Sequence, residues 1–176
     1  GLPTIQASYL LIDNATGAMR KIITGLRPTI LDDLGLLTAL EWQAEQFNKL
    51  TGVECRVNCV CDNSENNLIK LDKLRSIALF RIAQEALTNV TRHSGASRAD
   101  IELYRNEEEI VLSIIDNGRG MREKSQVPSN SYGMLGMRER VNQLGGTISF
   151  DTPHNGGFNV TAILPLPGNA AEQEPS

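Results

Sequence analysis

No stretch of about 18 consecutive apolar residues occurs in this sequence, so no segment of it has the length of a membrane-spanning helix. Basic residues are not in excess either, because 17 lysines and arginines stand against 21 acidic residues, for a formal charge of −4. An acidic chain is a poor partner for nucleic acid or an anionic membrane surface. No basic segment followed by an apolar one indicates a signal peptide. We therefore expect a cytoplasmic domain that contacts neither nucleic acid nor membrane.

The sequence begins at Gly1 rather than Met, which is typical of a piece of a longer protein. A parent anchored in the inner membrane is therefore compatible with it. Hydrophobic residues at 40% and charged residues at 22% are ordinary values for a globular protein. A length of 176 residues suits one domain with a helical appendage.

Cysteine is scarce and confined to one short segment. Cys55, Cys59 and Cys61 lie in 53–61, where the odd positions are apolar and the even positions mostly polar. This alternation predicts a strand with one face in the core. Side chains two residues apart on a strand are about 6.5–7 Å apart, and no histidine nearby in the sequence completes a zinc site. We predict buried, reduced cysteines, as in a reducing compartment.

Residues 1–28 predict a helix with a seam rather than part of a globular core. Mostly apolar side chains recur at alternating intervals of four and three residues, as in a coiled coil or a helix bundle. They are Ile5, Tyr9, Ile12, Thr16, Met19, Ile23 and Leu26. Pro28 ends this helix. We expect a globular domain over 29–167 and a disordered tail over 168–176.

The pattern of apolar and polar residues over 29–167 predicts an uneven alternation of helices and strands. Asp32 or Asp33 is suited to cap its first helix, and Gly52 to end it. The predicted helices cover about 34–50, 70–93 and 135–144, and the predicted strands cover about 53–61, 98–104, 109–115, 147–151 and 158–164. This order predicts the α+β class, a two-layer sandwich in which helices cover one face of a mixed β-sheet.

Four polar residues recur every four positions along the predicted helix over 70–93. They are Arg81, Glu85, Asn89 and His93, and this spacing places them on one slowly turning face. One interpretation is a solvated face with an Arg81–Glu85 ion pair worth a few tenths of a kcal/mol. The other is a metal and phosphate site, because Asn supplies a neutral oxygen for Mg²⁺ and Glu can orient a water ligand. The stripe alone does not decide between them.

The segment 116–120, Asp-Asn-Gly-Arg-Gly, directly follows the predicted strand over 109–115. Asn-Gly after a strand is a strong hairpin signal, but residues 121–126 lack the pattern of a returning strand. The alternative is a carboxylate held at the end of the sheet, where Asp116 accepts a hydrogen bond from the amine of adenine. Gly118 and Gly120 would then let the backbone approach the purine.

Glycines also lead into the predicted helix over 135–144. Gly133 and Gly136 flank Met134 and Leu135. The amino terminus of a helix carries unpaired N–H groups and the positive end of the helix dipole, and both favour phosphate. A glycine-rich helix start is weak evidence by itself, so its place in the order of motifs matters more.

The order of these motifs resembles the ATP-binding (Bergerat-type) fold shared by gyrase, MutL and the histidine kinases. Residues 84–93 resemble the Asn-containing box of that family, 116–120 its first glycine box and 133–136 its second. The segment 26–40 is similar to the junction between the dimerisation helix and the ATP-binding domain in nitrate-sensor-like kinases. The resemblance covers about residues 20–166.

This resemblance implies the role of each candidate residue. Asn89 would coordinate Mg²⁺ and Glu85 would act beside it through a water, these two being the catalytic pair. Asp116 would read adenine. The remaining nucleotide contacts would come from His93, Gly118, Gly120, Met121, Gly133, Met134, Leu135 and Gly136. Residues 121–132 would form the lid over ATP. One departure is Gly157-Phe158, where the family has Gly-Thr, and Thr161 lies too far along the strand to replace that threonine.

The resemblance further implies a sensor histidine kinase that works as a homodimer and passes phosphate to an Asp on a response regulator receiver domain. The two histidines of the sequence are His93 and His154, and neither lies in the predicted dimerisation helix over 1–28. We therefore expect this chain not to phosphorylate itself. Two alternatives are a non-catalytic interaction module with a degenerate ATP fold and a serine kinase that acts on an anti-sigma partner.

Overall fold

The computed structural model describes residues 29–61, 71–120, 132–153 and 156–167. Outside these residues lie the predicted helix over 1–28, most of the predicted lid with Met121, His154 and the predicted tail over 168–176. The side chain of His93 is likewise outside the described part.

A five-stranded sheet forms one layer of the molecule. Its strands are β1 (Glu54–Cys61), β2 (Arg98–Arg105), β3 (Glu109–Asp116), β4 (Thr147–Asp151) and β5 (Phe158–Pro165). They are arranged in the order β1-β2-β3-β5-β4, with β1 parallel to β2 and the other neighbours antiparallel. The sheet is therefore mixed, as the sequence predicts.

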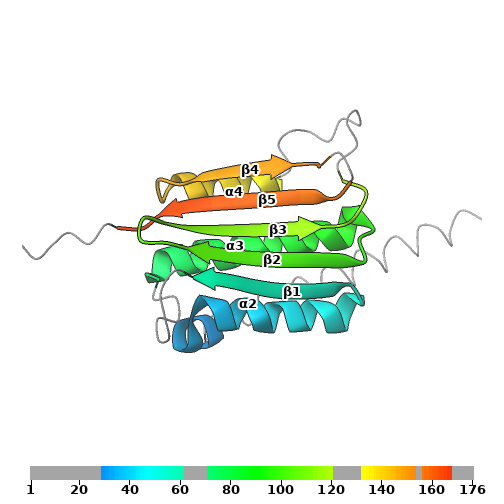
Figure 1. The fold of residues 1–176 in the computed structure, drawn as a ribbon, viewed down its shortest axis with the longest axis horizontal. Helices are drawn as coiled ribbons and strands as arrows, with labels where there is room; N and C mark the ends of the chain where they lie inside the picture. The colour runs from blue at the N-terminus through cyan, green and yellow to red at the C-terminus, as the bar shows by residue number, and fades with distance from the viewer. Residues whose placement is uncertain (1–28, 62–70, 121–131, 154–155, 168–176) are drawn as a thin grey trace, which may run out of the picture.

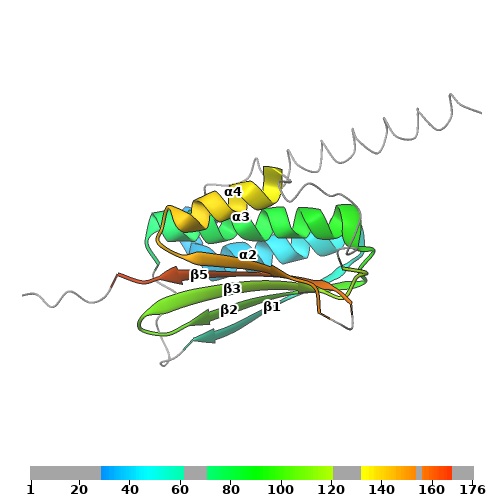
Figure 2. The same ribbon diagram turned by 90° about the horizontal axis from the view of Figure 1, so that it is seen from above.

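Three helices form the second layer and cover one face of the sheet, as Figures 1 and 2 show. They are α2 (Thr29–Thr51), α3 (Lys73–Asn89) and α4 (Tyr132–Asn142). This arrangement confirms the predicted α+β fold with helices on one face. No helix in the described ranges combines the length and the apolar composition of a membrane span.

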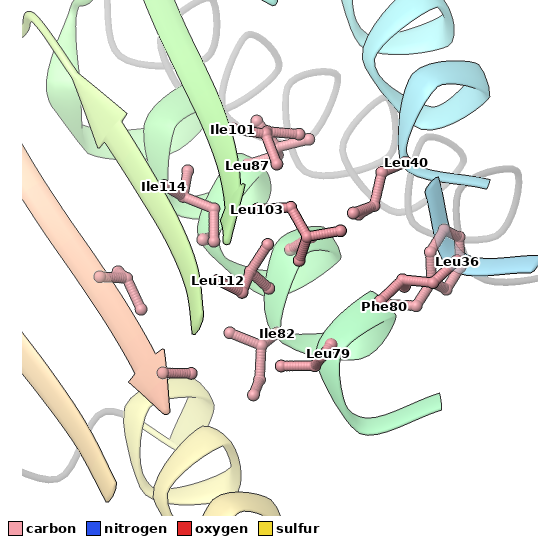
Figure 3. Packing of buried hydrophobic residues seen from close by; sticks show 14 of the residues in the cluster. Leu36, Leu40, Leu79, Phe80, Ile82, Leu87, Ile101, Leu103, Leu112 and Ile114 are labelled. Atoms are coloured by element: carbon pink, nitrogen blue, oxygen red, sulfur yellow. The ribbon is translucent and has the colours of Figure 1, made fainter. Parts of the chain in front are cut away.

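The core fills the space between the two layers. On β3 every second side chain is buried against the helices, namely Ile110, Leu112, Ile114 and Asp116. The labelled side chains of Figure 3 come from α2, α3, β2 and β3 and meet there. Alternation along each strand thus selects which residues reach the helices, and Asp116 continues the apolar row of β3.

The helix predicted over 34–50 begins earlier than expected, because α2 starts at Thr29. It contains a break at Gly35, whose φ of 82° and ψ of 178° are not helical. Asp32 therefore lies in the first turn instead of capping the helix, and it forms an ion pair with Lys73 at 3.2 Å. The prediction of a cap at Asp32 or Asp33 is wrong. Burial of Leu31 stabilises the turn before the break.

The helix predicted over 70–93 is divided in the structure. α3 begins after Asp72, which caps it by accepting a hydrogen bond from the Arg75 N–H, and it ends at Asn89. A π-helical turn, η1 (Val90–Ser94), continues it and ends at Gly95, whose φ is 61°. Such wide turns are frequent at functional sites.

The helix predicted over 135–144 also begins three residues earlier, at Tyr132. Gly133 and Gly136 therefore both lie within its first turns, and the prediction that Gly133 precedes the helix is wrong. The reason is packing: Met137 and Val141 are buried and Met134 packs against the core at helical spacing. This apolar stripe extends the helix through two residues of low helix propensity.

The strand with the cysteines is β1, as predicted. Cys55 is buried and Cys59 is half-buried on the face toward the helices. Burial, with a smaller effect of the nearby Asp100, raises the pKa of the Cys55 thiol to about 12. Cys55 is therefore a protonated core residue at neutral pH.

We predict that Leu112→Ala lowers the free energy of unfolding by about 2–5 kcal/mol, because Leu112 is fully buried in the centre of the sheet. Leu74→Ala serves as the matched control, because that side chain is 68% exposed. The control change is expected to stay within about 0.5 kcal/mol. Urea unfolding of both variants measures the difference, and equal losses would contradict the position of the core.

Candidate functional site

The candidate site lies at the end of the sheet where β3 ends and β2 and β5 begin. Asp116 is the last residue of β3, and its partners in register are Ala99 on β2 and Phe158 on β5. The Asp116 side chain is on the helix-covered face and is only 6% exposed. A carboxylate is thus held among apolar neighbours instead of projecting into solvent.

The ionisation of Asp116 is perturbed by this position. Burial raises the pKa of its carboxyl group, and the Gly118 N–H, which donates to Oδ1 at 2.8 Å, partly opposes the rise. Buried carboxylates with displaced pKa values are characteristic of functional sites, although ion-pair networks displace them too.

The loop after Asp116 is fixed to two other segments. The Asn117 N–H donates to the Arg98 carbonyl at 3.1 Å, and Asn117 Oδ1 accepts from the Ser97 and Arg98 N–H groups. The Arg119 N–H donates to the Ser94 carbonyl at 3.0 Å. The hairpin interpretation of 116–120 is therefore wrong, because β2 and β5 already occupy both sides of β3.

Glycines let the loops at this end of the sheet approach closely. A Cβ at Gly118 would lie 2.5 Å from the Ser94 carbonyl oxygen and 2.8 Å from Asp116 Oδ1. Gly157 has a φ of 87°, and a Cβ there would clash with the Asp116 carbonyl oxygen. Its N–H donates to the Gly118 carbonyl at 2.6 Å. Glycine is thus required at 118 by packing inside the protein, independently of any ligand.

The end of α3 reaches the same place. Glu85 and Asn89 lie one turn apart on α3, and both are half-buried. Asn89 is followed by η1, whose last residue, Ser94, accepts the hydrogen bond from Arg119 described above. The structure therefore brings the carboxyl ends of α3 and β3 to one end of the molecule, the end toward which the β3 arrow points in Figure 1.

The first turn of α4 lies against α3. A Cβ added at Gly133 would clash with the carboxylate of Glu85, so the helix backbone and this side chain are in close approach. Arg81, in contrast, donates to Gln84 Oε1 at 2.9 Å. Five of the predicted site residues therefore lie at one end of the fold, namely Glu85, Asn89, Asp116, Gly118 and Gly133.

Phe158, the partner of Asp116 in register, belongs to a group of three residues that was not recognised from the sequence. The rings of Phe150 on β4 and Phe158 on β5 are stacked, with centroids 6.3 Å apart and an interplanar angle of 11°. The guanidinium carbon of Arg138 on α4 lies 5.4 Å from the centroid of Phe150. Only the strand register reveals that Phe158 pairs with Asp116.

Thr161 takes no part in this site. Its hydroxyl lies 3.3 Å from the Ser113 hydroxyl across β3 and β5. Asp116 and Ser113 are three residues apart on β3, so their side chains point to opposite faces of the sheet. Thr161 is therefore on the uncovered face and cannot substitute for a residue beside Asp116.

We predict that Asp116→Asn raises the melting temperature at pH 7. Because the pKa of Asp116 is raised in the folded chain, ionisation of its carboxyl group favours unfolding. The protonated carboxyl group therefore contributes stability that is fully present below the ordinary pKa of 3.8 and is lost as the pH rises through the raised value. Asn removes the charge and retains an oxygen for the Gly118 N–H. Melting curves from pH 3 to pH 8 measure the effect, which should vanish at the acid end. A variant less stable than the parent at pH 7 would contradict it.

Comparison with known proteins identifies the family to which this site is similar. Residues 75–168, more than half of the chain, match the family described as histidine kinase-, DNA gyrase B-, and HSP90-like ATPase. The chain is 30% identical over 94% of its length to the signal transduction histidine-protein kinase/phosphatase DegS of Brevibacillus brevis. It is 30% identical over 84% of its length to the oxygen sensor histidine kinase NreB of Staphylococcus carnosus. It spans 41% of the length of each of these relatives.

Solved structures agree in fold. The histidine kinase domain of the blue-light activated kinase EL346 of Erythrobacter litoralis superposes with a TM-score of 0.54 at 23% identity, over 72% of this chain and 59% of that one. The mycobacterial sensor histidine kinase MprB superposes with a TM-score of 0.52 at 18% identity, over 72% of this chain and 93% of that one.

Proposed function

The chain belongs to the family of histidine kinase-, DNA gyrase B- and HSP90-like ATPases, and we propose that it binds Mg-ATP at the Asp116 end of the sheet and presents the γ-phosphate to a histidine. It is an ATP-binding catalytic domain of the sensor histidine kinase type. The main observation in support of this site is the buried carboxylate of Asp116, which lies beside the closely packed loops at 94–98, 117–120 and 156–157.

In this proposal Asp116 reads the base. One carboxylate oxygen is held by the Gly118 N–H, and the carboxylate would accept a hydrogen bond from the exocyclic amine of adenine. The low exposure of Asp116 strengthens this interaction, because hydrogen bonds to ionised groups gain strength away from water. Gly118 and Gly120 would border the purine, and Met121 would extend this border.

Asn89 and Glu85 are suited to the metal ion. The Asn89 amide offers a neutral oxygen ligand for Mg²⁺, and Glu85 would orient a water ligand. Within the described ranges no three His, Cys, Asp or Glu residues are grouped as a metal site. Mg²⁺ typically keeps several waters and shares substrate phosphates, so these two residues with the phosphates would suffice. Bound Mg²⁺ would neutralise charge on the phosphates.

The first turns of α4 are suited to the triphosphate. Their N–H groups lie at the amino end of the helix dipole, which favours anions. Gly133, Met134, Leu135 and Gly136 form this segment, and His93, which belongs to η1, would be a further contact. Positioning and charge neutralisation are the main contributions of a protein to phosphoryl transfer, and the close approach of Gly133 to Glu85 would place the phosphates beside the metal ligands.

We further propose that the acceptor histidine lies on a dimerisation helix, with residues 1–28 as part of that bundle and 29–167 as the catalytic domain. The two histidines of the chain are His93 and His154, so the chain alone would not phosphorylate itself. The complete kinase would act as a homodimer and pass the phosphate to an Asp of a response regulator.

We predict that Asp116→Ala weakens Mg-ATP binding about 10- to 100-fold, the effect of losing a hydrogen bond to a charged group. Glu102→Gln is the control, because Glu102 is an exposed carboxylate on the uncovered face. Calorimetric titration measures both affinities, with circular dichroism to verify folding. Absence of binding by the unaltered chain would favour a non-catalytic interaction module instead.

We predict that Asn89→Ala removes the gain in nucleotide affinity that Mg²⁺ provides. The expected pattern is a dissociation constant for ATP that no longer depends on Mg²⁺, whereas its value in EDTA changes little. Asn142→Ala, at the exposed end of α4, should keep the full Mg²⁺ dependence. Titrations with and without Mg²⁺ test this, and an unaltered dependence in Asn89→Ala would exclude Asn89 as a ligand.

A further inference from the structure

We propose that Phe158 is a specificity-determining residue of the nucleotide site, its ring forming the apolar surface against which adenine packs beside Asp116. This inference rests on the proposed function. It assigns a contact to the residue that stands where the resembling family has threonine.

The register of the sheet places Phe158 next to Asp116. The two residues are direct partners on the antiparallel strands β5 and β3, so their side chains leave the sheet on the same face. Cβ atoms of directly opposed residues are about 4.5–5.5 Å apart. A purine whose amine meets the Asp116 carboxylate would therefore lie within contact distance of the Phe158 ring.

Two further side chains hold the ring in place. Phe150 stacks on it from the β4 side, and Arg138 lies over Phe150 from α4. Because β5 lies between β4 and β3, Phe158 has Phe150 on one side and Asp116 on the other. Phe158 is only half-buried, so part of its ring is available for contact.

The chemistry of the ring differs from that of a threonine. Phenylalanine offers no hydrogen-bond donor or acceptor, and the Thr161 hydroxyl lies on the uncovered face with Ser113. Recognition of the polar edge of adenine would then depend mainly on Asp116. The ring would instead supply dispersion and stacking, which contribute to binding of any base with a π face.

The stack also connects the base site to the phosphate site. Arg138 belongs to α4, two residues after Gly136, and its contact with Phe150 joins this helix to β4 and β5. Adenine contact at Phe158 and phosphate contact at the start of α4 would therefore involve elements that pack on one another.

The test is the binding of Mg-ADP to the variants Phe158→Leu and Phe158→Tyr. Calorimetry measures the affinity, and proton NMR measures the chemical shifts of adenine H2 and H8. Loss of the ring in Phe158→Leu should weaken binding about 5- to 100-fold, the range for loss of one base–aromatic stack, and should abolish the upfield ring-current shift of these protons. Phe158→Tyr retains a ring and should keep both within a few-fold of the parent. Tyr104→Leu, on the uncovered face, is the matched control and should change neither.

Two results would overturn the inference while leaving the proposed function intact. One is a Phe158→Leu variant with parental affinity and an unchanged upfield shift. The other is a Phe158→Thr variant that binds Mg-ADP more tightly than the parent, which would show that the ring obstructs the base. Failure of the parent chain to bind Mg-ADP would instead defeat the proposed function, and this inference with it. Circular dichroism verifies that each variant is folded.

Discussion

The structure depends on a carboxylate being held on the covered face of a sheet, at the last position of a buried strand. Burial of an ionisable group costs free energy unless polar partners compensate for it. Around Asp116 the compensation comes from the Gly118 N–H, and the loops that deliver this group are tied to Ser94, Arg98 and Gly157. Close packing of backbone at this end of the sheet is therefore a condition for keeping Asp116 in position.

This condition explains why glycines are concentrated there. Gly118 and Gly157 lie where any Cβ would strike the backbone of a neighbouring segment or the Asp116 side chain itself. The usual interpretation of a glycine-rich motif is an approach to the ligand. Here the first requirement is the approach of loops to each other, and access for a purine would follow from the same absence of side chains.

Most of the fold could be predicted from the sequence because the strands alternate cleanly. The period of two in β2 and β3 identifies both their positions and their buried faces. Helix starts were predicted less well. The helices predicted from 34 and from 135 begin at Thr29 and Tyr132, because burial of Leu31 and Met137 extends helical structure past Gly35 and Gly133. Tertiary packing overrides local propensity at these positions.

The candidate site could be predicted in part. Asp116, Gly118, Glu85 and Asn89 stand in recognisable motifs whose order along the chain is informative. Phe158 could be identified only as a departure from a motif, because its proximity to Asp116 depends on the register of β5 against β3. A pairing between residues 42 positions apart cannot be obtained from local patterns.

The parallel pairing of β1 with β2 has a consequence for how the chain folds. These strands are connected through the whole of α3. Closing such a long connection lowers the conformational entropy of the chain before the strand contacts that compensate for this loss can form. The hairpins β2–β3 and β4–β5 need only short connections and can assemble sooner. Glu85 and Asn89, which lie on that connection, would then reach their final places late, so the proposed metal site would be completed only at the end of folding.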